Sequence, residues 1–345
     1  MSTLALLLAG TITLTTIPPT PLIERTKSGQ ALNFDLVITN SGASAITIEE
    51  IEASVLNAKD ALVLQRRLMS NGASIETIPN RRIEPGARLV VFNPFYEFEP
   101  DVDLKKIRFD LTFDDQQHAS IVVQPRVHET KADLILPLRG RVFVHDGHDF
   151  YSHHRRLDVT GTMTTALGVN ENMTRYAYDF TVVDERGAMH KGDGENNEDW
   201  FGFGTPILAP ANGIVVKAAA TRPDGAKSKP VPLQMDEVLK DITLIFGNFV
   251  ILDHGNGEFS FLAHMRNGSV TVKPGDRVKQ GQKIGEMGCS GDAMFPHLHY
   301  QLQRDASLGE GLPSYFRDYR RFTGDAFVRV TRGQIDTGDI VETTR

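Results

Sequence analysis

The stretch Cys289-Ser290-Gly291-Asp292-Ala293-Met294-Phe295-Pro296-His297-Leu298-His299-Tyr300 places two histidines one residue apart in a segment that predicts a β-strand. Successive side chains of a strand point to opposite faces, so His297 and His299 would project side by side from one face. Two adjacent imidazoles can serve one metal ion, although a sheet edge with two solvated histidines has the same pattern.

The composition is that of a globular protein large enough for two domains. The chain has 345 residues, of which 40% are hydrophobic and 23% charged. Its formal net charge of -7 and the lack of a dense Lys/Arg run argue against a nucleic-acid partner. Cys289 is the one cysteine, which excludes an intrachain disulfide and a Cys-rich zinc site. Any zinc would therefore bind to His and Asp or Glu side chains.

The beginning of the chain, residues 1–20, has two interpretations. Residues 1–10 contain a short apolar core like that of a cleaved signal peptide, but no Lys or Arg precedes this core. Residues 11–17 alternate like a strand, which favours the first strand of a folded domain. No run approaches the roughly 20 apolar residues that a membrane-spanning helix needs, so we expect no transmembrane segment.

The first part of the chain, residues 1–126, predicts a β-sandwich of immunoglobulin-like type. Short alternating segments such as Ala31–Asn40 and Ile107–Phe113 recur between turn residues. This part contains no evident metal-binding constellation, so we expect a structural or targeting role. Residues 127–139 are expected to form a linker.

The rest of the chain is also expected to be mainly β, with a second domain over residues 140–310. Gly204–Val216 predicts a hairpin around the turn at Asn212-Gly213, and Asn248–His264 predicts another that ends on a histidine. Residues 311–345 are expected to be a C-terminal extension that packs on this domain.

One carboxylate is placed unusually. Asp179 interrupts an aromatic and aliphatic strand, where burying an unpaired carboxylate would be costly. A metal ion would compensate the charge, and a salt bridge with Arg155, Arg156 or Arg175 is the alternative. The segment Gly140–Arg156, upstream of it, holds four of the eleven histidines of the chain.

Three blocks in this order resemble the lysostaphin-like zinc metallopeptidases. They are Gly204–Val216, Phe261-Leu262-Ala263-His264 and Gly288–Tyr300. The resemblance covers about residues 140 to 305 and implies a lysostaphin-like β-sheet peptidase domain of the duplicated-hybrid-motif type. The whole chain is thus expected to be mainly β, with the immunoglobulin-like sandwich followed by this peptidase domain.

The resemblance also implies roles for three histidines. His299 corresponds to a zinc ligand, and His264 and His297 correspond to the catalytic histidines. The two other ligands of the family, a histidine and an aspartate, normally lie in a His-x-x-x-Asp phrase before the Gly-Thr-Pro block. His190 and Asp193 lie in that place, but their spacing is one residue too short.

Asp179 is the better match for the aspartate. The phrase Tyr176-Ala177-Tyr178-Asp179-Phe180 resembles that of family members with an insertion between the two ligands. The histidine would then come from the segment Ser152–Arg156, as His154 or His153. Neighbouring strand residues face opposite sides, so only one of the two should reach the metal, and we favour His154.

The implied chemistry is that of a hydrolytic zinc site. His154, Asp179 and His299 would hold one Zn2+ per chain and leave a position for water. His264 and His297 would act as general base or stabilise the developing oxyanion, and the sequence does not divide these roles between them. Cys289 is not expected to be a nucleophile, because no base is arranged around it. The remaining histidines are expected to be solvated or locally hydrogen-bonded: His118, His128, His145, His148, His254.

The function implied by the resemblance is that of a zinc metalloendopeptidase whose substrate is bacterial cell-wall peptidoglycan. The alternative is a catalytically inactive family member that binds the cell wall or activates another hydrolase. A third hypothesis is a hydrolase of some other peptide. A cell-wall substrate would require export to the periplasm or the extracellular space.

Overall fold

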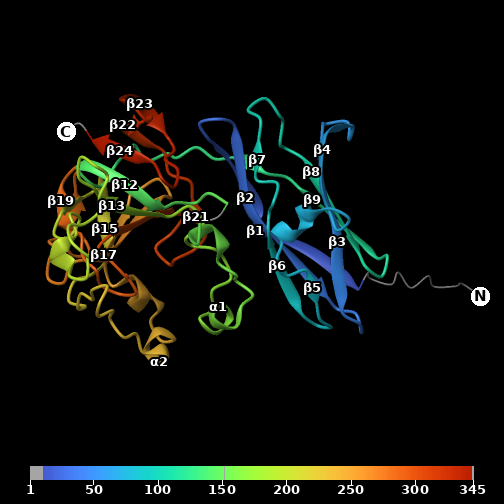
Figure 1. Cartoon of the computed structure of the whole chain (residues 1–345), viewed down its shortest axis with the longest axis horizontal. Helices are drawn as coiled ribbons and strands as arrows, with labels where there is room; N and C mark the ends of the chain where they lie inside the picture. The colour runs from blue at the N-terminus through green and yellow to red at the C-terminus, as the bar shows by residue number, and fades with distance from the viewer. Residues whose placement is uncertain (1–10, 151, 344–345) are drawn as a thin grey trace, which may run out of the picture. The chain divides into compact units, whose positions relative to one another are not determined.

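The computed structural model describes residues 11–150 and 152–343, and the apolar core proposed for a signal peptide, residues 1–10, lies outside them. The chain divides into two compact units (Figure 1). The first ends at His128 and also includes Asp158–Thr160, and the second consists of Glu129–Leu157 and the chain from Gly161 onward. Among the described residues, no helix has the length and apolar character needed to cross a membrane.

The N-terminal unit consists of two five-stranded sheets. One sheet has the order β10 (Arg126–Val127), β1 (Ile12–Arg25), β2 (Gln30–Asn40), β6 (Arg88–Phe92), with β7 (Glu97–Phe98) also paired to β2. The other has the order β4 (Leu62–Met69), β3 (Ile46–Leu56), β8 (Ile107–Phe113), β9 (His118–Val123), with β5 (Arg82–Ile83) also paired to β3. A short 3-10 helix, η1 (Ala73–Thr77), follows β4.

The two sheets share one hydrophobic core. Phe34 of β2 and Phe109 of β8 are both fully buried and meet edge to face, with ring centroids 5.5 Å apart. The odd-numbered residues of β8 are buried, as expected for a strand with one face on a core. Residues 12–20, which cleavage of a signal peptide would remove, belong to β1.

The second unit is built around a twelve-stranded sheet. Its strand order is β11 (Leu134–Ile135), β22 (Phe316–Phe322), β24 (Ile340–Thr343), β12 (Gly140–Asp146), β13 (Tyr178–Val182), β20 (Leu298–Gln303), β17 (Phe259–Met265), β16 (Asn248–Asp253), β15 (Gly213–Ala219), β18 (Arg277–Val278). Two further strands pair outside this path, β21 (Gly311–Leu312) with β20 and β23 (Phe327–Gly333) with β22. The chain is therefore mainly β, as predicted.

Only short helices interrupt the second unit. They are η2 (His154–Arg156), α1 (Thr162–Ala166), η3 (Asn197–Asp199), α2 (Met235–Val238) and η4 (Ile242–Phe246). The segment expected to be a linker contributes the buried residues Leu134, Leu136 and Leu138 to the core of this unit. The C-terminal residues enter the sheet itself, because β22 and β24 lie between β11 and β12.

The hairpin predicted for Gly204–Val216 is wrong. β14 (Pro206–Leu208) pairs with β19 (Lys283–Glu286) in a separate two-stranded sheet, whereas β15 pairs with β16 and β18. The connection contains Pro210, which favours an extended conformation at the preceding residue and disfavours a tight turn. The second predicted hairpin is confirmed, since β16 and β17 are paired antiparallel.

The central strands of the large sheet direct apolar side chains into the core from one face and candidate site residues from the other face. In the β13–β20 ladder, Tyr178 pairs with Tyr300 and Phe180 with Leu298, and these four side chains lie in the hydrophobic core. The intervening residues Asp179 and His299 pair with each other and therefore face away from that core. Three strands, β13, β20 and β17, thus form the base of the candidate site.

Candidate metal centre

Asp179 and His299 are brought together by the backbone of the sheet. They are direct partners in the antiparallel ladder, so their side chains leave the same face. His299 Nδ1 lies 3.2 Å from Asp179 Oδ1, and both side chains are buried. No salt bridge between Asp179 and Arg155, Arg156 or Arg175 is present among the described contacts, which are instead to histidines.

A third side chain close to Asp179 and His299 is that of His154, which lies in η2. Its Nε2 atom lies 3.4 Å from Asp179 Oδ1, and its Nδ1 atom lies 3.2 Å from the carbonyl oxygen of Gly147. His153 points elsewhere: its Nδ1 atom contacts Asp146, and 69% of its side chain is exposed. The structure therefore brings His154, and not His153, to Asp179 and His299.

The three side chains form a compact donor set. One nitrogen of His154, one nitrogen of His299 and one carboxylate oxygen of Asp179 all lie within 4.8 Å of one another. Two ligands about 2.0–2.1 Å from a tetrahedral zinc ion are about 3.3 Å apart, which is close to the measured separations. Two nitrogens and one carboxylate oxygen also match the ligand types of hydrolytic zinc sites.

Hydrogen bonds on the far side of each ring show why a cation fits here. His154 Nδ1–H donates to Gly147, and His299 Nε2–H donates to Gln301 Oε1 at 2.9 Å. A neutral imidazole has one N–H and one lone pair, so both rings direct a lone pair toward the Asp179 carboxylate. A metal cation placed between the two rings and the carboxylate would be attracted by both lone pairs and by the negative charge of Asp179.

His297 and His264 adjoin this donor set. His297 Nε2 lies 3.6 Å from Asp179 Oδ1, and the His297 and His264 ring centroids are 4.7 Å apart. Each ring donates Nδ1–H to a backbone carbonyl at 2.8 Å, His297 to Phe295 and His264 to Ser290. Both Nε2 atoms consequently carry a lone pair that is available to a substrate or a water molecule.

A β-bulge in β17 sets the orientation of the His264 side chain. Val250 pairs with Leu262 and Asn248 pairs with Met265, so β17 has one residue more than β16 at this point. His264 lies within the bulge and has a φ angle of 58°, a left-handed conformation that is uncommon for residues other than glycine. Such strained positions persist where the surrounding structure enforces them, and they are frequent at functional sites.

The electrostatics of the cluster follow from burial and close charges. Burial alone would raise the pKa of the Asp179 carboxyl, but His154, His297 and His299 hold that pKa well below its usual range. Burial lowers the pKa of His264 well below its usual range, and His297 and His299 add to this effect. The cluster therefore favours an ionised aspartate beside a neutral His264.

The other candidates lie away from this cluster. The ring of His190 packs on Trp200, with centroids 4.7 Å apart, and the Asp193 carboxylate caps the backbone of Glu195. Neither belongs to the Asp179 donor set. Cys289 is fully buried and contacts the Ala293 carbonyl, and burial raises the pKa of its thiol to about 12, which does not suit a nucleophile.

Three residues for which the sequence predicted no role at the site also border it. Asp292 Oδ1 lies 3.8 Å from His264 Nε2. His145, expected to be solvated, packs on Phe295 with ring centroids 4.8 Å apart. Gln301 holds His299, and its place two residues after His299 on a strand was a usable signal, because such residues share a face.

A cavity of about 490 Å³ opens beside the cluster. All five predicted site residues line it, together with His145, His153 and Asp292. Its other walls are mostly apolar and come from α1, α2, η4 and the segments next to them. The cavity gives a substrate access to Asp179, His264, His297 and His299.

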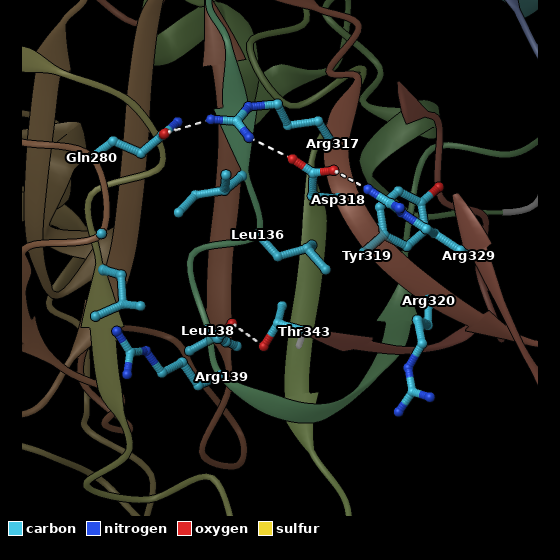
Figure 2. A pocket seen from close by; sticks show the side chains of 13 residues that line it. Leu136, Leu138, Arg139, Gln280, Arg317, Asp318, Tyr319, Arg320, Arg329 and Thr343 are labelled. Atoms are coloured by element: carbon cyan, nitrogen blue, oxygen red, sulfur yellow. Dashed lines mark hydrogen bonds and ion pairs between the residues drawn. The ribbon is translucent and has the colours of Figure 1, made fainter. Parts of the chain in front are cut away.

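A second cavity of about 590 Å³ in the same unit has a different character (Figure 2). Figure 2 shows Arg317 between Gln280 and Asp318, and Asp318 between Arg317 and Arg329. Arg320 pairs with Glu342, so acidic partners already balance three arginines. Among the described residues that line this cavity none is a histidine, and we assign it no catalytic role.

The profile of Peptidase family M23 matches residues 198–309. The matched stretch contains His264, His297 and His299, whereas His154 and Asp179 precede it.

Curated relatives match over short stretches. The peptidoglycan DD-endopeptidase ShyC of Vibrio cholerae is 33% identical over 99 residues, which are 29% of this chain and 17% of ShyC. The peptidoglycan DD-endopeptidase ShyA of the same organism is 41% identical over 56 residues, 16% of this chain and 13% of ShyA. The matched regions are thus less than a fifth of the length of these relatives.

Among solved structures, the catalytic domain of lysostaphin from Staphylococcus simulans is similar with 24% identity and a TM-score of 0.25, over 40% of this chain and 74% of that domain. The matched stretch includes β17 and β20, which carry His264 and His299, and it also includes His297 directly before β20. Residues 198–309 of this chain form a domain of peptidase family M23, the lysostaphin-like metallopeptidases.

Proposed function

We propose that this protein is a zinc-dependent metalloendopeptidase that cleaves peptide bonds in bacterial cell-wall peptidoglycan. The observation that carries the proposal is the convergence of His154, Asp179 and His299 within 4.8 Å, beside the M23 residues His264 and His297. The lone pairs directed at the Asp179 carboxylate support a metal ion at this place.

The proposed ligands are His154, Asp179 and His299, holding one zinc ion per chain. When bound, zinc would lower the pKa of a coordinated water molecule and polarise the scissile carbonyl. The ladder pair Asp179 and His299 fixes two ligands on one sheet face, and the hydrogen bond to Gly147 fixes the ring of His154.

The proposed catalytic residues are His264 and His297. Their free Nε2 atoms can accept a proton from the attacking water or, once protonated, donate a hydrogen bond to the developing oxyanion. The low pKa of His264 favours a neutral ring, whose Nε2 lone pair can accept a hydrogen bond from a water molecule. His297 Nε2 lies 3.6 Å from the Asp179 carboxylate, so its ring borders the proposed zinc site directly.

The substrate proposal draws on the relatives. ShyC and ShyA are named peptidoglycan DD-endopeptidases, and each shares part of the M23 region with this chain. We accordingly propose a location in the cell envelope.

The division of the chain is a proposal as well. We propose an immunoglobulin-like β-sandwich over residues 1–126, a linker over 127–139, the peptidase domain over 140–310 and a C-terminal extension over 311–345. The support for the first part is its two sheets around a common core, which are antiparallel except for the parallel pair β1 and β10.

The test begins with metal content. We expect about one zinc ion per purified chain, loss of this zinc in Asp179→Ala, and full retention in the matched control His190→Ala. Purified peptidoglycan is then digested with zinc-loaded protein, and the released fragments are identified by mass spectrometry. Zinc without new peptide ends would point to a binding or hydrolase-activating module, and zinc lost in His190→Ala would refute the ligand set.

A further inference from the structure

Asp292 is a carboxylate in the cavity beside the metal centre. None of the described residues that line this cavity is a lysine or an arginine, so the lining offers Asp292 no permanently charged cation. Among the described residues, its ion-pair contact is with His264, whose Nε2 atom lies 3.8 Å from Asp292 Oδ1. The nature of this one contact decides what Asp292 can bind.

The contact between Asp292 and His264 lacks a hydrogen atom. His264 donates its Nδ1–H to the Ser290 carbonyl at 2.8 Å, so the Nε2 atom of the neutral ring carries a lone pair. An ionised carboxylate is likewise only an acceptor. A nitrogen with two N–H bonds, about 2.9 Å from each atom, could donate one hydrogen bond to His264 and one to Asp292. The pair is therefore suited to an amino or ammonium group.

A single turn of the backbone positions both acceptors. The carbonyl of Ser290 holds the His264 ring, and two residues later the N–H of Asp292 donates to the Ile245 carbonyl at 3.0 Å. Gly291, between them, has a φ angle of 78°, and a Cβ atom there would clash with the Ile245 oxygen. The spacing between the carboxylate and the imidazole is thus fixed by the backbone.

The charges of the site allow a cation at Asp292 even with zinc bound. The two positive charges of zinc and the negative charge of Asp179 leave one positive charge, which the carboxylate formed by cleavage would neutralise. Asp292 lies outside the Asp179 donor set and keeps its own charge. Burial raises the pKa of the Asp292 carboxyl, whereas His299 and His297 oppose this shift, and solvent limits it because 59% of the side chain is exposed.

Hydrolysis of an amide produces the group that this pair can receive. The C–N bond of the scissile amide breaks, its electron pair stays on nitrogen, and the oxygen of water bonds to the carbonyl carbon. Both protons of the water molecule end on that nitrogen, so the products are a carboxylate and an ammonium, and nothing is oxidised or reduced. Every amide bond that is hydrolysed in peptidoglycan yields this pair of products, whichever side chains flank the bond.

We propose that Asp292 and the Nε2 atom of His264 together bind the nitrogen of the leaving group as it becomes an ammonium. The proposal rests on the proposed peptidase function and adds a catalytic carboxylate to the two histidines. Asp292 contacts the departing nitrogen and not the metal ion. Its removal should slow the departure of an amine and spare a leaving group that acquires no positive charge.

The test compares an amide substrate with the corresponding ester. The amide is a peptide identified from the peptidoglycan digest, and the ester is the same peptide with the scissile N–H replaced by oxygen, so that it releases an uncharged alcohol. For zinc-loaded Asp292→Ala we expect kcat on the amide to fall about tenfold to a hundredfold, the contribution of one hydrogen bond to a charged group. The kcat on the ester should change by less than about threefold, and the zinc content should stay the same.

An acidic residue outside the cavity lining provides the matched control. Asp236 on α2 has a side chain that is 78% exposed, and it is not among the lining residues, although its neighbour Met235 is. Asp236→Ala removes the same charge from the same unit. Both the amide and the ester rates of this variant should stay within about twofold of the original values.

Three results would overturn the role of Asp292. An equal loss on amide and ester in Asp292→Ala would show a general effect on the site, and an unchanged amide rate would show that the carboxylate does not contact the leaving nitrogen. Loss of zinc in this variant would make Asp292 part of the metal site. By contrast, an original protein that holds no zinc and cleaves neither compound would overturn the proposed function itself.

Discussion

The Nε2 atom of His299 lies 2.9 Å from Oε1 of Gln301, two residues further along the same strand. Gln301 in turn donates to Gln303 Oε1 at 2.6 Å, and Gln303 donates to the Asp305 carbonyl at 2.5 Å. This chain of amides orients the Gln301 oxygen toward His299 and fixes the N–H of the ring on the far side from Asp179. The His299 nitrogen proposed to bind zinc is thereby oriented before a metal ion would bind.

Replacing Gln301 should weaken metal binding without touching a ligand. In Gln301→Leu the His299 N–H loses its acceptor, and we expect zinc affinity to fall roughly tenfold to a hundredfold. Competition with a chromogenic chelator measures this affinity. Gln301→Glu, which retains an acceptor oxygen, should stay near the original value, and a loss of equal size in both variants would contradict the role of the hydrogen bond.

Adjacent histidines of η2 and its N-cap should differ sharply in their effect on zinc. His154→Ala removes a buried nitrogen 3.4 Å from Asp179, so we expect zinc to be lost at micromolar protein concentration. His153→Ala removes a largely exposed ring that contacts Asp146, so zinc should be retained. Elemental analysis of both variants after dialysis decides the matter. Zinc retained in His154→Ala but lost in His153→Ala would reverse the assignment.

Removal of either proposed catalytic histidine should separate chemistry from metal binding. We expect His264→Ala and His297→Ala to keep zinc and to lose activity by about a hundredfold or more, the usual contribution of a positioned acid or base. The measurement is kcat on a peptide identified from the peptidoglycan digest, with zinc content determined on the same samples. Activity within a few-fold of the original protein in both variants would refute their proposed roles.

His254 should make the second unit less stable in mild acid. Its Nδ1 atom contacts the Asn212 carbonyl and its Nε2 atom contacts Ser260 Oγ, both at 2.8 Å. Burial lowers the pKa of His254 below its ordinary value, although the Asn212 carbonyl and the carboxylates of Glu258 and Asp253 oppose this shift.

The unfolded chain therefore takes up the proton first as the pH falls below about 6.5, and the free energy of unfolding decreases. The stabilising effect is fully present above that pH. Urea unfolding at pH 7.5 and 5.5 should show a smaller pH effect in His254→Gln than in the original protein. The other histidines are the same in both proteins, so identical pH effects would show that His254 does not contribute.

The sequence was sufficient to predict the mainly β architecture and the parts of the site that are local in the chain. The spacing of His297 and His299 predicts a shared face, and the carboxylate of Asp179 in an apolar strand predicts a compensating partner. Pairing between strands is a tertiary property, so the partner of β14 could not be read from the turn signal at Asn212-Gly213.

Other features depend on geometry that leaves little trace in sequence. The bulge at His264 can be predicted only when the register between β16 and β17 is known. The apolar cavity unites α1 with α2 and η4, whose short segments have no periodicity that would mark a common surface. The hydrogen bond from His154 to Gly147 depends on how a loop folds back on itself.

The aromatic face of β13 bears on whether related proteins keep the candidate metal site. Tyr178 and Phe180 stack with ring centroids 5.2 Å apart, and both meet Phe316 on the side of the sheet opposite Asp179. A slip of the β13–β20 ladder by one residue would drive these rings out of the core and turn Asp179 into it. The buried stack thus fixes the register between β13 and β20. A homologue could keep all four histidines and the aspartate and still lack the proposed metal site, if the aromatic rings that fix the register of the ladder were replaced.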